Sequence, residues 1–339
     1  AGTWSVAQAP EKYTTIKEAM EKALKGKATL LYAQGSNIWR NRELQENGEQ
    51  GKPIAWGEEV KMKNEALQIA KEADVIICAM GETADMSGEC ASRTNLEMPD
   101  VQQELLAELA KMGKPVVLLN FAGRPTVLSW ENEHIPAIMN VWFGGSEVGD
   151  ALCDVIFGDK VPSGKLTTSM PKTTGQEPLY YNHQNTGRPV PDDNQKFAKF
   201  ASNCLDVSNG PLYPFGYGLS YTTFEYGDLK LSSHEVNMDD WKITATINVK
   251  NTGSRDADEV VQLYIRDMVA SISRPVKELK GFQRIHLAAG ESREISFDIT
   301  PEMFKFYNAE LKHVIEPGDF QIMVGGNSKE VKTQNLTVK

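Results

Sequence analysis

The hydrophobic positions of the chain follow two different periods, and the change of period divides the sequence. In the first half, short continuous apolar runs alternate with segments in which apolar residues recur every three or four positions. A run of about six residues is typical of a strand buried on both faces, and the longer spacing is typical of a helix with one buried face. The runs are residues 28–33, 75–80, 116–121 and 137–142, and the helical segments are 15–24, 58–73, 100–112 and 148–156.

This alternation predicts an α/β domain over residues 14–170, in which a mostly parallel sheet is sandwiched by helices. Thr15 and Glu18 have the spacing of a capping box at the start of the first helix. Residues 1–13 show no periodic pattern and are interpreted as the remnant of a linker.

From Lys242 the period becomes two. Apolar and polar residues alternate in several short stretches, among them Ile243 to Val249 and Ile295 to Ile299, and turn residues separate these stretches. The pattern is typical of an all-β sandwich, which we place at residues 224–339. Residues 171–223 are rich in Pro, Asn, Gln, Asp and Gly, and they are predicted to form a long connecting segment.

Two long polar loops carry the candidate chemistry. Residues 82–99 follow the apolar run 75–80 and contain Glu82, Asp85, Glu89 and Glu97, with Asp100 directly after them. The loop leaves the carboxyl end of a predicted parallel strand, where open α/β sheets bind their ligands. A solvated acidic loop is the ordinary alternative for most of these carboxylates. One of them is a candidate for catalysis.

The second long loop, residues 35–57, carries Trp39 and Trp56. Aromatic side chains on polar loops can stack against sugar rings, and they can also anchor a loop to the core. Both interpretations stay open for the two tryptophans.

Composition narrows the class of protein. The chain has 339 residues, 40% of them hydrophobic, which is enough for two domains with separate cores. A net charge of −10 argues against nucleic acid or an anionic membrane surface as a partner. No apolar segment approaches the roughly 18 residues that span a bilayer, so no membrane span is expected. The 4 cysteines and 5 histidines lack the spacing of a metal site, so we expect no metal.

The sequence lacks the motifs of a nucleotide-binding protein and of a serine hydrolase. The glycine-rich segment 144–147 has neither of the two phosphate-binding fingerprints, and the chain contains no G-x-S-x-G elbow. We therefore expect no cofactor.

Several long motifs, in order along nearly the whole chain, resemble glycoside hydrolase family 3, the family of β-glucosidases and β-xylosidases. They are SGECASR (87–93), WFGGSEVGDALCDVIFGDKVPSGKLTTSMP (142–171), GQEPLYYNHQNTGRP (175–189), LYPFGYGLSYTTF (212–224), SRPVKELKGF (273–282) and EPGDFQIMVGG (316–326). The resemblance implies an α/β sandwich domain followed by a fibronectin type III-like β-sandwich. The two domains agree with those that the hydrophobic pattern predicts.

The resemblance also implies a retaining, exo-acting β-glucosidase that is located in the periplasm or outside the cell. Family members carry an N-terminal (β/α)8 barrel with a nucleophilic aspartate in a motif containing Ser-Asp-Trp, and this sequence has no such motif. The chain is therefore expected to be the C-terminal portion of a longer enzyme and to be inactive alone. Its partners would be that barrel and an oligosaccharide or an aryl or alkyl β-glucoside, and a homodimer is kept as a candidate.

Glu89 occupies the glutamate position of the family's SGE-like motif, which implies that it is the general acid/base. It also lies in the middle of its loop, between Gly88 and the small residue Cys90, where a carboxyl can project outward. Asp85 and Glu82 remain alternatives. Arg93, Trp39 and Trp56 are candidates for sugar contacts. A noncatalytic carbohydrate-binding or interaction module is the rival hypothesis, and measurable sugar affinity without the barrel would mark it.

Overall fold

The computed structural model describes residues 12–46, 56–190, 197–238 and 240–339, and the chain divides into two compact units. The first unit is Ala1–Lys160 with Pro171–Glu177, and the second is Val161–Met170 with Pro178–Lys339. The predicted linker remnant, residues 1–13, lies almost entirely outside the described residues.

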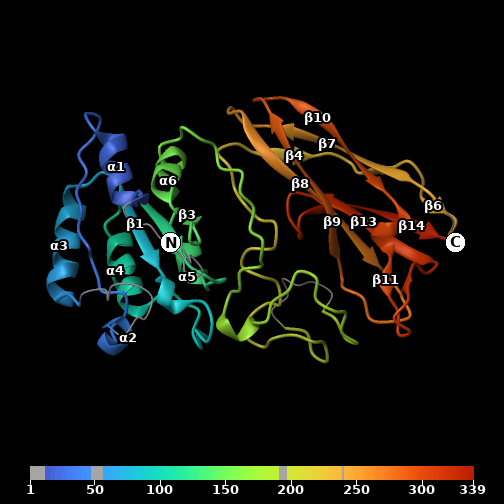
Figure 1. Ribbon diagram of the computed structural model, residues 1–339, viewed down its shortest axis with the longest axis horizontal. Helices are drawn as coiled ribbons and strands as arrows, with labels where there is room; N and C mark the ends of the chain where they lie inside the picture. Colours follow the sequence, from blue (N-terminus) through green and yellow to red (C-terminus); the bar gives the residue numbers. More distant parts are fainter. Residues whose placement is uncertain (1–11, 47–55, 191–196, 239) are drawn as a thin grey trace. The chain divides into compact units, whose positions relative to one another are not determined.

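The first unit contains a parallel sheet of three strands in the order β1-β2-β3. Figure 1 shows these strands lying among the helices of the unit. Its elements are α1 (Ile16–Leu24), α2 (Arg42–Glu46), α3 (Glu59–Glu72), β1 (Ile76–Gly81), η2 (Ala84–Met86), α4 (Asp100–Ala110), β2 (Val116–Phe121), α5 (Ser129–His134), β3 (Ala137–Asn140), α6 (Val148–Ile156) and η3 (Thr174–Gln176). The predicted α/β class is confirmed.

The two faces of the sheet are buried by different helices, which explains why its strands are apolar throughout. Ile76 and Cys78 of β1 pack into a cluster with Leu105 of α4 and Ala66 of α3. Ile77, which points to the other face, packs against the cluster that α1 and α6 form. Successive residues of a strand point to opposite faces, so a strand covered on both sides needs an apolar residue at every position.

Thr15 caps α1 as predicted, because its hydroxyl accepts from the Glu18 N–H while the Glu18 carboxylate accepts from the Thr15 N–H. The predicted strand at residues 28–33 is wrong. These residues pair with no strand in the described part of the chain, and Leu31 and Tyr32 are exposed. The run is apolar because Leu30 and Ala33 pack against the two hydrophobic clusters that lie on either side of the sheet, not because the run is itself a strand of that sheet.

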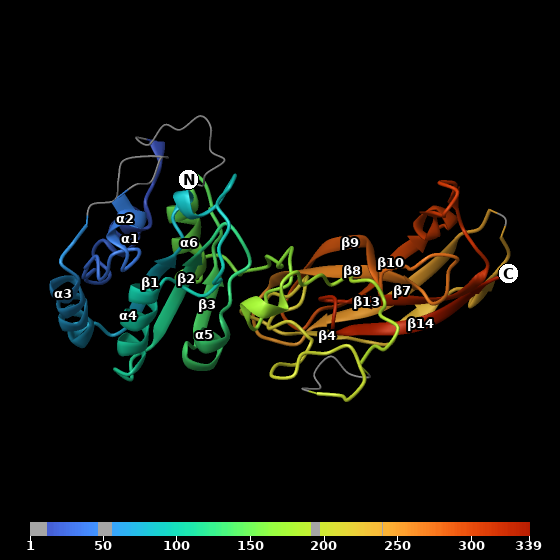
Figure 2. The ribbon, with the colours of Figure 1, turned by 90° about the horizontal axis from the view of Figure 1, so that it is seen from below.

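The second unit contains the predicted β-sandwich (Figure 2). One sheet has the order β10-β7-β4, and the other has the order β6-β14-β13-β8-β9. The strands are β4 (Phe224–Tyr226), β5 (Lys230–Leu231), β6 (Glu235–Val236), β7 (Ile243–Asn251), β8 (Ala257–Asp267), β9 (Glu278–Leu287), β10 (Ser292–Ile299), β11 (Phe306–Tyr307), β12 (His313–Val314), β13 (Gly318–Gly325) and β14 (Val331–Val338), with η4 at Pro301–Phe304.

The two sheets enclose one apolar core. On β7 the residues Ile243, Ala245, Ile247 and Val249 are buried, and the polar residues between them are more exposed. They meet the inward residues of β8 and β13 from the other sheet, such as Leu263 and Ile322. The period of two in the sequence is thus explained by burial on one face of each sheet.

Segments outside the sandwich strands also belong to the second unit. Leu166 pairs its backbone with Gly216 and Tyr217, and the Lys165 ammonium lies 3.0 Å from the buried Glu259 carboxylate. Gly216 has a φ of +81°, and a Cβ there would lie 2.1 Å from the Gln262 side-chain oxygen, so only glycine fits.

All four cysteines are free, and Cys78 and Cys153 are buried as small apolar side chains. Within the described ranges, no helix combines the length and the apolar character that crossing a bilayer requires.

Candidate active site

The loop of residues 82–99 leaves the carboxyl end of β1 through a tight passage beside β2. Gly81 has a φ of +126°, and a Cβ there would lie 2.0 Å from the Phe121 carbonyl oxygen. The next amide, of Glu82, donates to this same carbonyl at 2.7 Å. Gly81 is therefore required for the strand end to stay this close to β2.

Glu82 is the buried anchor of the loop. Only 1% of its side chain is exposed, and its carboxylate lies 2.8 Å from Arg93 Nη1 and 3.1 Å from Arg124 Nε. The backbone N–H of Gly123 also donates to it, at 3.0 Å. A buried carboxylate is tolerated only when it is paired and hydrogen-bonded, and Glu82 meets both conditions.

The two arginines that pair with Glu82 also hydrogen-bond to backbone carbonyls of the loop. Arg124 donates through Nη2 to the carbonyls of Met86 and Ala91, at 2.7 Å for Ala91. Arg93 donates through Nη2 to the Glu97 carbonyl at 2.9 Å. We call Glu82, Arg93 and Arg124 the carboxylate brace. Because its contacts to the backbone lie on both sides of Glu89, the brace fixes the segment that carries this residue.

Glu89 itself is exposed at the turn of the loop. The residues on either side of it, Gly88 and Cys90, have φ values of +110° and +58°, so the backbone turns sharply at this point. Within the part of the chain that the structure describes, its carboxylate makes no hydrogen bond or ion pair. An exposed carboxylate on a braced turn can meet a ligand without first breaking an internal contact.

The other loop carboxylates have different surroundings. Glu97 is exposed and accepts from the Asn95 amide at 3.2 Å, and Asp100 accepts from the Arg40 N–H at 3.2 Å at the start of α4. Asp85 is exposed within η2.

Arg93 and Trp39 are brought together. The guanidinium of Arg93 lies over the Trp39 ring, 5.2 Å from its centroid. Since 9% of the Arg93 side chain is exposed and two of its nitrogens already donate within the loop, Arg93 orients Trp39 and the loop. Direct sugar contact by either residue stays a prediction.

A hydrogen-bonded contact joins the segment that carries Trp56 to the segment that carries Trp39. The buried Asn37 side chain donates to the Gly57 carbonyl and accepts from the Gly57 N–H, both at 2.9 Å. The segments that carry Trp39 and Trp56 are therefore held together. Among the described residues, no ring contact or hydrogen bond joins Trp56 to Arg93 or Glu89, and its sugar contact also stays a prediction.

Arg124 and Asn37 are site residues that the sequence analysis missed. A signal for Arg124 was present, since it follows the apolar run 116–121 as Glu82 follows the run 75–80. The carboxyl ends of neighbouring parallel strands lie at one edge of a sheet, so an acid after one and a base after the next can meet. Asn37 left no comparable signal in its Asn- and Gln-rich loop.

Glu131 on α5 gives this unit a predicted pH dependence. It is only 2% exposed, and burial raises the pKa of its carboxyl to about 6, with the nearby Glu97 adding to the effect. The unfolded value is about 4.3, so the folded state holds the proton more tightly and stability falls as pH rises through 6. Glu131→Gln should raise the free energy of unfolding by about 2 kcal/mol at pH 7 and change it little near pH 4.

The Glu131 prediction is checked by denaturant unfolding of wild type and Glu131→Gln between pH 4 and pH 7. Fluorescence of Trp130, whose ring stacks on His134 at 4.4 Å within α5, can follow this unit. Exposed Glu133→Gln on the same helix is the matched control. A stability difference that stays constant with pH would mean that folding does not raise the pKa of Glu131.

Two family models match the chain. Residues 1–221 match the glycosyl hydrolase family 3 C-terminal domain, and residues 259–328 match a fibronectin type III-like domain. The chain is 43% identical to the periplasmic β-glucosidase of Salmonella typhimurium over 98% of its own length and 43% of that protein. It is 37% identical to a β-xylosidase of Formosa agariphila, over 97% of its own length and 42% of that protein.

The chain is also similar to part of a solved structure. The chain superimposes on the β-glucosidase of Listeria innocua in complex with glucose with a TM-score of 0.84 and 33% identity. The match covers 99% of this chain and 43% of that one. The chain thus spans less than half the length of these relatives.

Proposed function

This chain belongs to glycoside hydrolase family 3, and on that premise we propose that it is the C-terminal part of a retaining, exo-acting β-glucosidase, with Glu89 as general acid/base. The observation that carries the proposal is the braced loop, which fixes its backbone through Glu82 and leaves Glu89 exposed. The β-glucosidases among the relatives support glucosides as the substrate class.

Retaining hydrolysis needs two carboxyl groups about 5–5.5 Å apart. One attacks the anomeric carbon and forms a glycosyl-enzyme, while the other protonates the leaving oxygen and later takes a proton from water. We assign the second role to Glu89. The nucleophile would come from a (β/α)8 barrel in the same parent protein, in the part of the relatives' length that this chain does not match.

Neither the attack nor the proton transfers call for a metal or a cofactor. Trp39 and Trp56 are proposed to form apolar walls for sugar, and Arg93 to hold Trp39 in place. The periplasmic relative supports a location in the periplasm or outside the cell.

The proposal predicts that the chain expressed by itself folds but hydrolyses aryl β-glucosides no faster than buffer. Each unit has its own apolar core, whereas only one of the two reacting carboxyl groups is assigned to this chain. The measurement is release of nitrophenol from p-nitrophenyl β-glucoside, with the full-length parent as positive control. Turnover that persists after removal of contaminating glycosidases would mean that the nucleophile lies within these 339 residues.

A further inference from the structure

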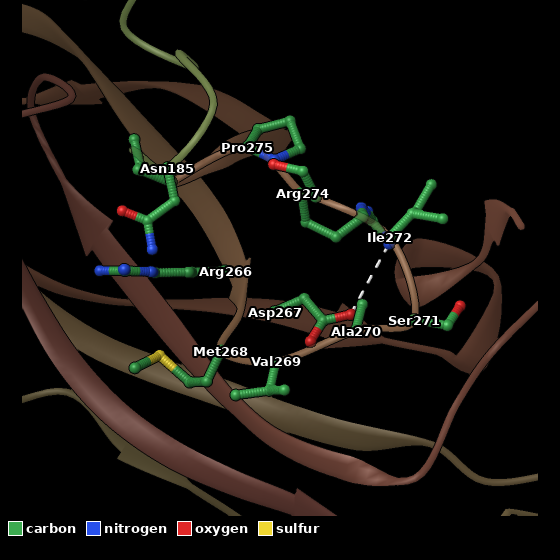
Figure 3. A pocket seen from close by; sticks show the side chains of 12 residues that line it. Asn185, Arg266, Asp267, Met268, Val269, Ala270, Ser271, Ile272, Arg274 and Pro275 are labelled. Carbon is green, nitrogen blue, oxygen red and sulfur yellow. Dashed lines mark ion pairs between the residues drawn. The ribbon is translucent and has the colours of Figure 1, made fainter. Parts of the chain in front are cut away.

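The second unit has a pocket of about 370 Å³ where β8 ends (Figure 3). An ion pair between Asp267 and Arg274 forms part of its wall. Asp267 Oδ1 and Arg274 Nη1 are buried, so a ligand in the pocket does not reach these atoms. We assign no ligand to this pocket.

A buried glutamine in the first unit contacts both of the segments that carry candidate site residues. Gln102 lies in the first turn of α4, and only 3% of its surface is exposed. Its side-chain oxygen accepts from the Gly81 N–H at 2.7 Å. Its Nε2 donates to the Gly81 carbonyl at 3.0 Å and to the Ile38 carbonyl at 3.2 Å. Because Gly81 begins the path into the loop of residues 82–99 and Ile38 directly precedes Trp39, one side chain joins the two segments.

The place of Gln102 follows from the edge of the sheet. β1 is an outer strand in the order β1-β2-β3, and the Glu82 N–H points toward β2, where it donates to the Phe121 carbonyl. Neighbouring residues of a strand direct their backbone groups to opposite sides, so the N–H and the carbonyl of Gly81 point away from β2. No strand among the described residues pairs with that edge of β1. The Gln102 amide takes its place, because an amide has an oxygen that accepts and two hydrogens to donate.

The residue on the other side of Trp39 is held by the same helix. The Arg40 N–H donates to Asp100 at 3.2 Å, and the Arg40 guanidinium lies 2.7 Å from the Glu104 carboxylate. These side chains are about half exposed, and exposed ion pairs contribute little to stability. Gln102 is buried, and a buried polar group that loses its partner is costly. Of the contacts from α4, those of Gln102 should therefore fix Trp39 most firmly.

This arrangement sets the position of Trp39 relative to the loop that carries Glu89. Arg93, in that loop, lies over the Trp39 ring, and the Trp39 side chain is partly exposed, so part of the ring remains available to a ligand. Under the proposed function, Glu89 protonates the leaving oxygen of the substrate. A ring held beside its loop is therefore placed to contact the leaving group.

We propose that Gln102 is a positioning residue, which holds Trp39 where it contacts a sugar leaving group and so favours disaccharides over simple alkyl glucosides. The inference rests on the proposed function and adds the part of the substrate that Trp39 recognises. The second glucose of a disaccharide has a ring that can stack on Trp39, whereas methanol has none. Both leaving groups need a proton from Glu89, so an effect on Glu89 alone is shared by the two substrates.

The test is a ratio of two kcat/KM values, for a glucose disaccharide and for methyl β-glucoside, measured in the full-length parent. The disaccharide is the one that wild type hydrolyses fastest among cellobiose, laminaribiose, sophorose and gentiobiose. Gln102→Met keeps the length of the side chain and removes its three hydrogen bonds. It should lower the ratio at least about 10-fold, because a misplacement of about 1 Å can cost on the order of 10²-fold.

A double variant shows whether Gln102 acts through Trp39. Trp39→Ala should lower the ratio by itself, and adding Gln102→Met to it should change the ratio by less than about 2-fold. Gln102→Asn is the second variant if Gln102→Met does not fold. It keeps an amide at this place, but it is one methylene too short to reach both Gly81 and Ile38, so its ratio should also fall.

The matched control is Gln103→Met, the same change at the next residue of α4. Gln103 is half-buried, and its side chain makes no hydrogen bond within the described part of the chain, so the ratio should stay at the wild-type value. Far-ultraviolet circular dichroism confirms that each variant is folded.

The inference is overturned if the Gln102 variants fold and keep the wild-type ratio, or if Trp39→Ala keeps it. It is also overturned if the effects of Gln102→Met and Trp39→Ala multiply in the double variant, since the two residues then act separately. A wild-type parent that hydrolyses neither substrate would overturn the proposed function and this inference with it. An active parent with an unchanged ratio overturns this inference alone.

Discussion

In the full-length parent enzyme, Glu89→Ala should slow the hydrolysis of an alkyl β-glucoside by roughly 10²- to 10⁴-fold. A dinitrophenyl β-glucoside should lose far less, because its leaving group departs without a proton. The carboxylate is exposed and makes no ion pair among the described residues, so the free energy of unfolding should change by no more than about 0.5 kcal/mol. Loss of rate with unchanged stability is the pattern expected of a proton donor.

Azide provides the second readout for Glu89. It needs no general base to attack the glycosyl-enzyme, so in Glu89→Ala it should restore turnover and yield a glycosyl azide of retained configuration. Glu97→Ala, another exposed carboxylate of the same loop, is the matched control and should leave the leaving-group dependence unchanged.

If Glu89→Ala lowers the hydrolysis rates of both substrates equally and azide has no effect, Glu89 is not the proton donor. Asp85 would then be the next candidate. Glu82 is a poor one, because its carboxylate is buried and already accepts from two arginines and the Gly123 N–H.

Glu82→Ala should lower the free energy of unfolding of the first unit by about 3–5 kcal/mol, because it leaves Arg93 and Arg124 partly buried without their common anion. Glu82→Gln should recover part of this loss, since its amide oxygen can still accept from the Gly123 N–H. Because these arginines hydrogen-bond to carbonyls of the loop backbone, their loss of position should also make residues 82–99 exchange their amide hydrogens faster.

The Glu82 prediction is checked by denaturant unfolding with hydrogen exchange, which separates the transition of β1 and β2 from that of the β-sandwich. Glu97→Ala serves again as the control, with an expected change below about 1 kcal/mol because its side chain is exposed. A loss of under about 1 kcal/mol for Glu82→Ala would mean that the brace contributes little to stability. If Glu82→Ala in the full-length parent speeds amide exchange of the loop but leaves kcat unchanged, the carboxylate brace is not needed for catalysis.

Most of the fold could be predicted because its signals are local. β1, β2 and β3 begin within one residue of the apolar runs that predicted them, and Thr15 caps α1 where the capping box placed it. The failure at residues 28–33 has a physical cause. An apolar run indicates burial and does not by itself indicate strand pairing. Here two hydrophobic clusters bury Leu30 and Ala33, while residues 28–33 pair with no strand among the described residues.

For the candidate site, sequence reasoning located the loop and its carboxylates, and it kept Glu82 as an alternative to Glu89. Sequence reasoning could not identify the ion-pair partners of Glu82. Arg93 lies 11 positions away and Arg124 lies 42 positions away, and neither spacing belongs to a recurring motif.

The sequence by itself determined most of the kinds of element, the two fold classes along the chain and the exposed position of Glu89, because periodicity, capping and turns depend on neighbouring residues. Only the tertiary structure decided that one buried carboxylate holds two arginines against the loop. Charge pairing requires side-chain atoms within a few ångströms of each other. For residues far apart in the chain, that proximity is set by how the strand ends are arranged in space, which no local pattern records.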